Sequence, residues 1–226
     1  MSARTESNQR APLRVNVGCG GTPTPGWVNL DNSLTVRLAK FPGLVRILFH
    51  LGVVGQATLN FARAAVQKDI VWADAARRIP LPDASAMVLY NSHMLDCLGR
   101  TAARKFLAEA HRVLMPGGIL RIALADLLRH ARRYVEETKD ADVFVGALLL
   151  TDDDPKGARA ALRRVAVGFR EHRWMYDARS LIRLLEACGF RDAVELAPGT
   201  TTIPDPGELN LREREEESFY VEARRP

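Results

Sequence analysis

Two glycines and a carboxylate near the start of the chain have a spacing that suits a nucleoside-binding site. The β-type run Val15–Val17 leads into Gly18-Cys19-Gly20, and a second β-type run, Trp27–Leu30, is followed by Asp31. Glycine lets the backbone approach a ligand closely, and a carboxylate after a strand can accept hydrogen bonds from two ribose hydroxyls. The pattern predicts a site for an adenosine-containing cofactor in an open α/β sheet.

The residues after the second glycine disfavour a nicotinamide dinucleotide. The dinucleotide fingerprint needs a third glycine three positions later, and a helix whose N-terminus faces the pyrophosphate. This chain has Pro23 at that position, and Pro23 and Pro25 together forbid a long regular helix between the first two strands. A cofactor without phosphates would not require that helix.

Polar residues follow three later β-type runs, where the carboxyl ends of parallel strands hold ligands. They are Asp74 after Ile70–Ala73, Asn91 and His93 after Ala86–Tyr90, and Asp126 after Ile119–Leu124. An imidazole with a near-neutral pKa can take a proton from a hydroxyl, so His93 is the candidate catalytic residue. The alternative is a histidine packed beside the cofactor, with its ring nitrogens bonded to the backbone. Asp126 either faces a substrate or caps the next helix.

The composition describes an ordinary globular chain of 226 residues, 47% hydrophobic and 26% charged, with a net charge of +5. We expect a flexible tail over 1–12 and one domain over 13–226. The sequence shows no secretory signal and no membrane span, and Cys19, Cys97 and Cys188 are too scattered for a disulfide framework, which predicts a cytoplasmic location. No basic run is interleaved with aromatic residues, which disfavours a nucleic-acid partner. No cluster has the spacing of metal ligands, which predicts a site without metal.

Strands alternate with helical stretches until the end of the chain, where Ala193–Leu196 and Ser218–Ala223 form two successive strands. This order predicts an α/β fold: a doubly wound, mostly parallel seven-stranded sheet with an antiparallel last strand, Rossmann-like, with helices on both faces. Leu34–Gln67 is helical by composition, either as an insertion after strand two or as a plain crossover helix. The charged stretch Leu127–Phe169 reads as largely helical, with a break near 151–155. The long polar stretch Leu196–Glu217 suits a loop at the active site.

Eight blocks of the sequence, in this order, resemble the class I S-adenosylmethionine-dependent methyltransferases, and most closely their bacterial type 11 members. The blocks are 15–20, 26–31, 79–83, 92–96, 110–118, 172–177, 187–190 and 218–223. The run Arg112-Val113-Leu114-Met115-Pro116-Gly117-Gly118 is very specific to this superfamily, and the resemblance covers nearly the whole chain. One departure stands out: relatives often have Leu-Glu-His-Leu where this chain has Leu95-Asp96-Cys97-Leu98. Any role that this second histidine has in relatives is therefore not carried over to this chain.

The resemblance also implies roles for individual residues. Those implied to bind S-adenosylmethionine are Gly18, Cys19 and Gly20 under its methionine part, Asp31 and Asn32 at the ribose, Asp74 and Ala75 at the adenine, and Asn91 beside the methionine carboxylate or the sulfonium. Those implied to face the acceptor are Asp126, His172 and Tyr176. His172 and Tyr176 could instead belong to a cluster that anchors the helix beginning near Asp177.

The implied reaction is transfer of a methyl group from S-adenosylmethionine to a small-molecule acceptor, leaving S-adenosylhomocysteine. We expect an oxygen of a sugar, glycan precursor or specialised metabolite first, and a nitrogen second. A general base is needed only for a poorly acidic acceptor, such as a sugar hydroxyl. The alternative is a cofactor-binding protein of the same fold with a non-methylating or regulatory activity.

Overall fold

The computed structural model describes residues 12–149 and 171–226. Nearly all of the tail expected over 1–12 lies outside these residues. The break expected near 151–155, and the rest of the stretch up to Phe169, lie outside them as well.

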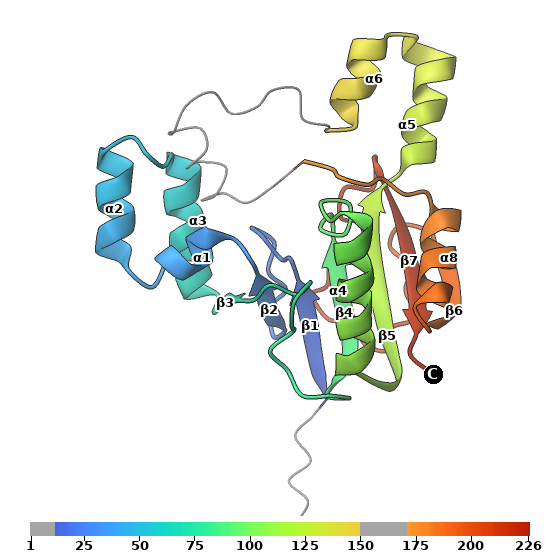
Figure 1. Cartoon of the computed structure of the whole chain (residues 1–226), viewed down its shortest axis with the longest axis horizontal. Coiled ribbons are helices and arrows are strands. Elements are labelled where there is room, and N and C mark those ends of the chain that lie inside the picture. The colour runs from blue at the N-terminus through green and yellow to red at the C-terminus, as the bar shows by residue number, and fades with distance from the viewer. Residues whose placement is uncertain (1–11, 150–170) are drawn as a thin grey trace, which may run out of the picture.

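Seven strands form one sheet in the order β3-β2-β1-β4-β5-β7-β6 (Figure 1). Their bounds are β1 Leu13–Val17, β2 Val28–Asp31, β3 Val71–Trp72, β4 Ala86–Ser92, β5 Leu114–Ala125, β6 Arg191–Leu196 and β7 Ser218–Arg224. Strands β1 to β5 pair in parallel, whereas β7 is antiparallel to both β5 and β6. The predicted mostly parallel sheet with an antiparallel last strand is confirmed. The chain reverses direction across the sheet between β1 and β4, and open α/β sheets bind ligands at such a switch point.

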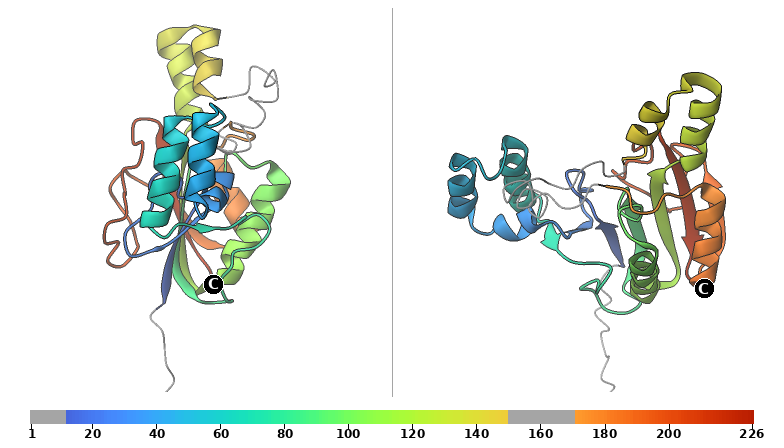
Figure 2. Two further views of the ribbon diagram at one scale, coloured as in Figure 1. Left: turned by 90° about the vertical axis from the view of Figure 1, so that its left-hand side faces the viewer. Right: turned by 45° about the horizontal axis from the view of Figure 1, so that its top comes forward.

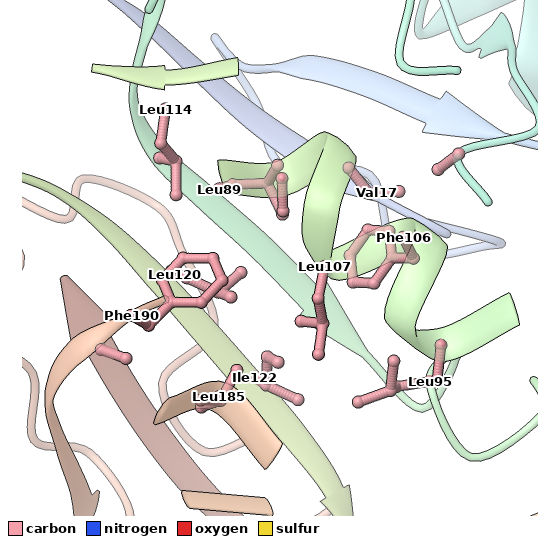
Figure 3. Close-up of a cluster of buried hydrophobic side chains, with 14 of the residues drawn as sticks. Val17, Leu89, Leu95, Phe106, Leu107, Leu114, Leu120, Ile122, Leu185 and Phe190 are labelled. Atoms are coloured by element: carbon pink, nitrogen blue, oxygen red, sulfur yellow. The ribbon is translucent and has the colours of Figure 1, made fainter. Parts of the chain in front are cut away.

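Two helices cover one face of this sheet, α4 (Arg100–Val113) and α8 (Ala178–Ala187). Phe106 and Leu107 of α4 and Leu185 of α8 are fully buried against strand residues (Figure 3). Each such side chain stabilises the fold by about 1.5–3 kcal/mol relative to exposure. Helix α8 begins where the sequence predicts, because the Asp177 carboxylate accepts from the Ser180 amide at 2.7 Å in a capping box.

The opposite face of the sheet is covered differently from the doubly wound pattern. Here the segment 197–217, rather than a helix, packs on the strands (Figure 2, left). Its Ile203 and Leu209 join a buried cluster with Trp27, Val88 and Tyr220. The long polar stretch expected at the active site therefore serves largely as the cover of this face.

A buried ion pair fixes that cover to the sheet. Arg121 of β5 and Glu222 of β7 lie 2.7 Å apart and are 0% and 2% exposed. Arg121 also donates to the carbonyl oxygens of Thr200 and Leu211, and the Glu222 carboxylate accepts from the hydroxyl of Thr201. These bonds satisfy charges that would otherwise be costly to bury.

Two helical groups stand on either side of the carboxyl edge of the sheet (Figures 1 and 2). The first follows β2 and consists of α1 (Leu34–Leu38), α2 (Pro42–His50) and α3 (Gln56–Gln67). Three helices in place of one favour the insertion over a plain crossover helix. The second group follows β5 and consists of α5 (Leu127–Arg133), the π-helical turn η1 (Tyr134–Thr138) and α6 (Ala141–Ala147). None of the described helices is long and apolar enough to cross a lipid bilayer.

Candidate functional site

The glycine loop lies at the end of β1, between the ends of β2 and β4. Val17 is opposite Leu30 on one side and opposite Asn91 on the other. The amides of Gly18 and Cys19 both donate to the Leu30 carbonyl, at 2.8 and 3.1 Å. This register brings Gly18, Asp31 and Asn91 together at the switch point.

Both loop glycines adopt a left-handed conformation, with φ of 71° at Gly18 and 49° at Gly20. A Cβ on Gly18 would lie 2.9 Å from the Met94 side chain, whereas a Cβ on Gly20 would meet nothing within 4 Å. Gly18 is therefore required by both its conformation and its neighbour. Met94 is not among the expected site residues, and its only signal in the sequence is its place directly after His93.

Asp31 ties the end of β2 to the glycine loop. One carboxylate oxygen accepts from the Gly20 amide at 3.0 Å, and the other accepts from the Ser33 amide at 2.8 Å. A carboxylate oxygen has two acceptor sites, so each oxygen keeps one for a ligand. Asp31 can thus hold the loop and accept from two ribose hydroxyls at once.

The residues expected at the adenine lie on the neighbouring strand end. Asp74 and Ala75 follow β3, and no described residue donates to the Asp74 carboxylate, although its backbone carbonyl accepts from the Arg77 and Arg78 amides. Asn32 is exposed, and its carbonyl accepts from the indole of Trp72 at 3.0 Å. The free carboxylate of Asp74 suits the exocyclic amine of an adenine.

Asn91 is fully buried and only half satisfied. Its amide nitrogen donates to the Val17 carbonyl at 2.8 Å, while its Oδ1 atom has no partner among the described residues. A buried amide oxygen without a partner is costly unless a ligand or water satisfies it. With the glycine loop, Asp31 and Asp74, this orphaned oxygen fits an adenosine cofactor that carries a polar amino-acid part.

His93 follows β4 in a left-handed conformation, with φ of 46°. Its Nε2 atom is 2.9 Å from the Ser218 hydroxyl, and its Nδ1 atom is 3.8 Å from the Asp96 carboxylate. Burial, with smaller contributions from the charges of Arg214 and His172, lowers the pKa of His93 to about 3. The ring is therefore neutral near pH 7, and its side chain is only 8% exposed.

Asp96 joins His93 to His172. The Asp96 carboxylate is 3.3 Å from Nε2 of His172, and its other oxygen accepts from the Cys97 amide at 3.0 Å. Burial raises the pKa of Asp96, while the neighbouring His172 acts in the opposite direction. In the sequence, Asp96 stands out only as a departure from the relatives' pattern, and Ser218 only as the first residue of a predicted strand.

The other two residues expected at the acceptor have structural roles. The Asp126 carboxylate caps α5 by accepting from the Leu128 amide at 3.0 Å, which is the second of its two expected roles. Tyr176 is 4% exposed within the core cluster, and its burial raises the pKa of the phenol. Of the three residues expected at the acceptor, His172 is the one that the Asp96 carboxylate links to His93 within the described part of the chain.

The chemistry of the remaining candidates is limited. Burial and the charge of Asp31 raise the pKa of the Cys19 thiol, which therefore stays protonated and is no nucleophile. Within 12–149 and 171–226, no group of three or more histidine, cysteine, aspartate or glutamate side chains is arranged to hold a metal ion.

Residues 52–122 match the family described as "Methyltransferase domain". The match covers less than half of the 226 residues, and this part of the chain is similar to that family. No curated protein matches the sequence.

Solved structures resemble the chain over most of its length. An S-adenosylmethionine-dependent methyltransferase of Methanosarcina mazei is 14% identical, with a TM-score of 0.50 over 96% of this chain and 93% of the other. The PH0226 protein of Pyrococcus horikoshii is 13% identical, with a TM-score of 0.50 over 96% and 84%. A Thermotoga maritima methyltransferase, described as a possible histamine N-methyltransferase, is 15% identical, with a TM-score of 0.49 over 96% and 83%. At these identities the two structures with a TM-score of 0.50 show the fold alone.

Proposed function

We propose that the chain is a class I S-adenosylmethionine-dependent methyltransferase and that it acts on an oxygen of a small-molecule acceptor, namely a sugar, a glycan precursor or a specialised metabolite. The observation that carries the proposal is the place of His93 directly after β4. This strand carries Asn91, and its end lies beside the end of β1, where the glycine loop begins. A hydroxyl acceptor benefits from a hydrogen-bond acceptor that orients it and from a group that takes its proton.

The cofactor site consists of Gly18, Cys19, Gly20, Asp31, Asn32, Asp74, Ala75 and Asn91. When bound, S-adenosylmethionine supplies the methyl group of its sulfonium to the acceptor and leaves as S-adenosylhomocysteine. Asp31 accepts from the ribose hydroxyls while it keeps the loop closed through the Gly20 amide. The unpartnered oxygen of Asn91 accepts from a polar hydrogen of the amino-acid part.

His93 is the proposed catalytic residue. If its Nε2–H group donates to Ser218, its Nδ1 atom keeps a lone pair, and this atom has no hydrogen-bond partner among the described residues. A neutral ring also adds no positive charge near a sulfonium. Because the pKa of His93 is about 3, the ring holds a proton poorly. We therefore expect it to orient the acceptor hydroxyl and pass the proton to the Asp96 carboxylate, whose pKa burial raises.

The test uses the purified full chain, S-adenosylmethionine labelled with carbon-13 in its methyl group, and small-molecule extracts as the source of acceptors. We expect release of S-adenosylhomocysteine and a labelled product whose methyl resonance is that of a methoxy group. A resonance typical of an N-methyl group would replace the oxygen acceptor with a nitrogen. Tight cofactor binding without product in any fraction would favour the alternative of a non-methylating or regulatory protein.

A further inference from the structure

The helical group α1–α3 contains an open groove at the β3 edge of the sheet, with a volume of about 970 Å³. Its apolar lining comes from all three helices, from the residue before α2 and from β3, and it includes Val36, Phe41, Val45, Leu59, Val66 and Trp72. Sites for small molecules have volumes of about 300–1,000 Å³ and mostly apolar walls. The groove has the size and the wall of a ligand site.

Much of this apolar wall is open to solvent. Phe41 is 63% exposed, Val66 is 58% exposed and Trp72 is 38% exposed. Soluble proteins rarely expose large contiguous apolar patches, and such patches commonly mark binding surfaces. A ligand chain in the groove would remove these three side chains from water.

The charged residues of the groove are almost all cations. Arg37, Lys40, Arg46 and Arg63 line it, against a single carboxylate from Asp69. None of these four cations has a carboxylate partner within 4.0 Å among the described residues, and the Arg37 guanidinium lies 4.8 Å from the centre of the Trp72 ring. The cations are thus available to an acidic group, and the apolar wall beside them is available to a chain.

We propose that this groove binds one molecule of an amphiphile with an apolar chain and a carboxylate or phosphate head. The chain packs against Phe41, Val66 and Trp72, and the head contacts the cations at the rim. The site is separate from the methyl-transfer site, because none of the proposed cofactor or catalytic residues lines the groove. The two sites are connected through Trp72, whose indole donates to the Asn32 carbonyl at the end of β2.

The alternative occupant is a membrane surface. Ile47 and Leu51 are 57% and 62% exposed on the same helical group, but neither of them lines the groove. A flat lipid surface would contact such outward side chains, whereas a single chain needs a concave wall. The concave wall with a cationic rim favours a single molecule.

The first test titrates dodecyl phosphate into the full chain below its micellar concentration, with calorimetry and tryptophan fluorescence as readouts. The matched probe is dodecyltrimethylammonium, which has the same chain and the opposite charge. We expect dodecyl phosphate to bind at least about tenfold more tightly, since both the chain and the rim attract it. The fluorescence change should disappear in Trp72→Phe. Equal binding of the two amphiphiles, or an unchanged signal in Trp72→Phe, would overturn the proposal.

The second test removes two exposed cations of the rim in Arg46→Gln/Arg63→Gln. The matched control is Lys68→Gln, which removes an exposed cation that follows α3 but does not line the groove. We expect the double variant to lose about tenfold or more in affinity for dodecyl phosphate while the control keeps it. Affinity for S-adenosylhomocysteine should be the same in all three proteins. Wild-type affinity in the double variant would overturn the proposal. The proposal would also be overturned if the protein bound phosphatidylglycerol vesicles but not dodecyl phosphate, and if Ile47→Gln/Leu51→Gln abolished the binding to vesicles.

Discussion

The Oδ2 atom of Asp96 lies 3.3 Å from Nε2 of His172, and their side chains are only 1% and 4% exposed. Nδ1 of His172 lies 2.9 Å from the Leu148 carbonyl, next to the end of α6. The backbone carbonyl of Asp96 accepts from the amides of Arg173 and Trp174, at 2.8 and 3.1 Å. One buried pair thus fixes the loop after β4, which carries His93, to the helical group after β5.

Asp96→Asn should loosen this connection. The substitution keeps an oxygen for the Cys97 amide but removes the charge that faces His172, so we expect the free energy of unfolding to fall by about 1–3 kcal/mol. Amide hydrogen exchange over 141–149 should become faster. The control is Asp69→Asn, on an exposed carboxylate, which should change neither measurement. Unchanged exchange in Asp96→Asn would show that the pair does not hold α6.

His93→Asn should lower turnover and leave cofactor affinity nearly intact. Asparagine tolerates the left-handed conformation at this position better than most residues do. General-base assistance contributes about 10²–10⁴-fold, and we expect a loss of turnover in that range. His93→Gln, which keeps a polar head but cannot relay a proton, should be impaired almost as much. Cofactor affinity that falls in step with turnover would make His93 a binding residue instead.

The stability of the protein should depend on the protonation of His93. Its pKa is about 3 in the folded protein, against about 6.5 in the unfolded chain, so the unfolded chain binds more protons between these values. The contribution of the neutral ring is complete above about pH 6.5 and is lost as the pH falls towards 3, by at most about 1.4 kcal/mol per pH unit. Asp96 acts in the opposite sense, because the stability from its raised pKa is lost as the pH rises.

The measurement is urea unfolding of wild type and His93→Asn at about pH 7 and about pH 5. The variant keeps Asp96 and His172, so the difference between the two proteins isolates the contribution of His93. We expect the wild type to lose more stability than the variant between the two pH values. Parallel losses would show that His93 does not titrate as its burial implies.

The sequence predicts most of the strands well, because apolar runs act locally. Pro116 and the two glycines after it are a local signal against a strand, yet β5 already begins at Leu114. Sheet pairing overrides the local signal here: Ala86 pairs with Leu114 and Val88 with Ile119, so the extra residues form an irregularity opposite β4. Gly117 absorbs it with a φ of 77°.

The side-chain network around His93 was not predictable in the same way. Asp96, His172 and Ser218 are far apart in the chain and meet only through the packing of three segments. The role of 197–217 as the cover of a sheet face depends on the Arg121–Glu222 pair, and neither residue has a local signal for burial. Long-range contacts of this kind require the fold itself.

Gly18→Ala should be more damaging than Gly20→Ala. Both substitutions force a left-handed conformation on alanine, at a cost of about 1–2 kcal/mol, but only the new Cβ at position 18 would clash with Met94. We expect the larger losses of unfolding free energy and of S-adenosylmethionine affinity in Gly18→Ala. Adding Met94→Ala to that variant should recover part of the difference. Equal effects of the two glycine substitutions would show that the contact between position 18 and Met94 does not matter for the glycine loop.

Asp31→Asn should weaken the binding of S-adenosylhomocysteine by about 1–3 kcal/mol, or roughly 5- to 150-fold, because polar groups of the ligand lose a charged acceptor. Asp31 also holds the amides of Gly20 and Ser33, so a loss of affinity alone does not separate contact from loop support. Calorimetry with a 2′,3′-dideoxyribose analogue of the ligand separates them. If Asp31 accepts from the ribose hydroxyls, wild type and variant should bind the analogue with nearly equal affinity. The same loss for both ligands would mean that Asp31 only shapes the glycine loop, and another residue would then have to hold the ribose.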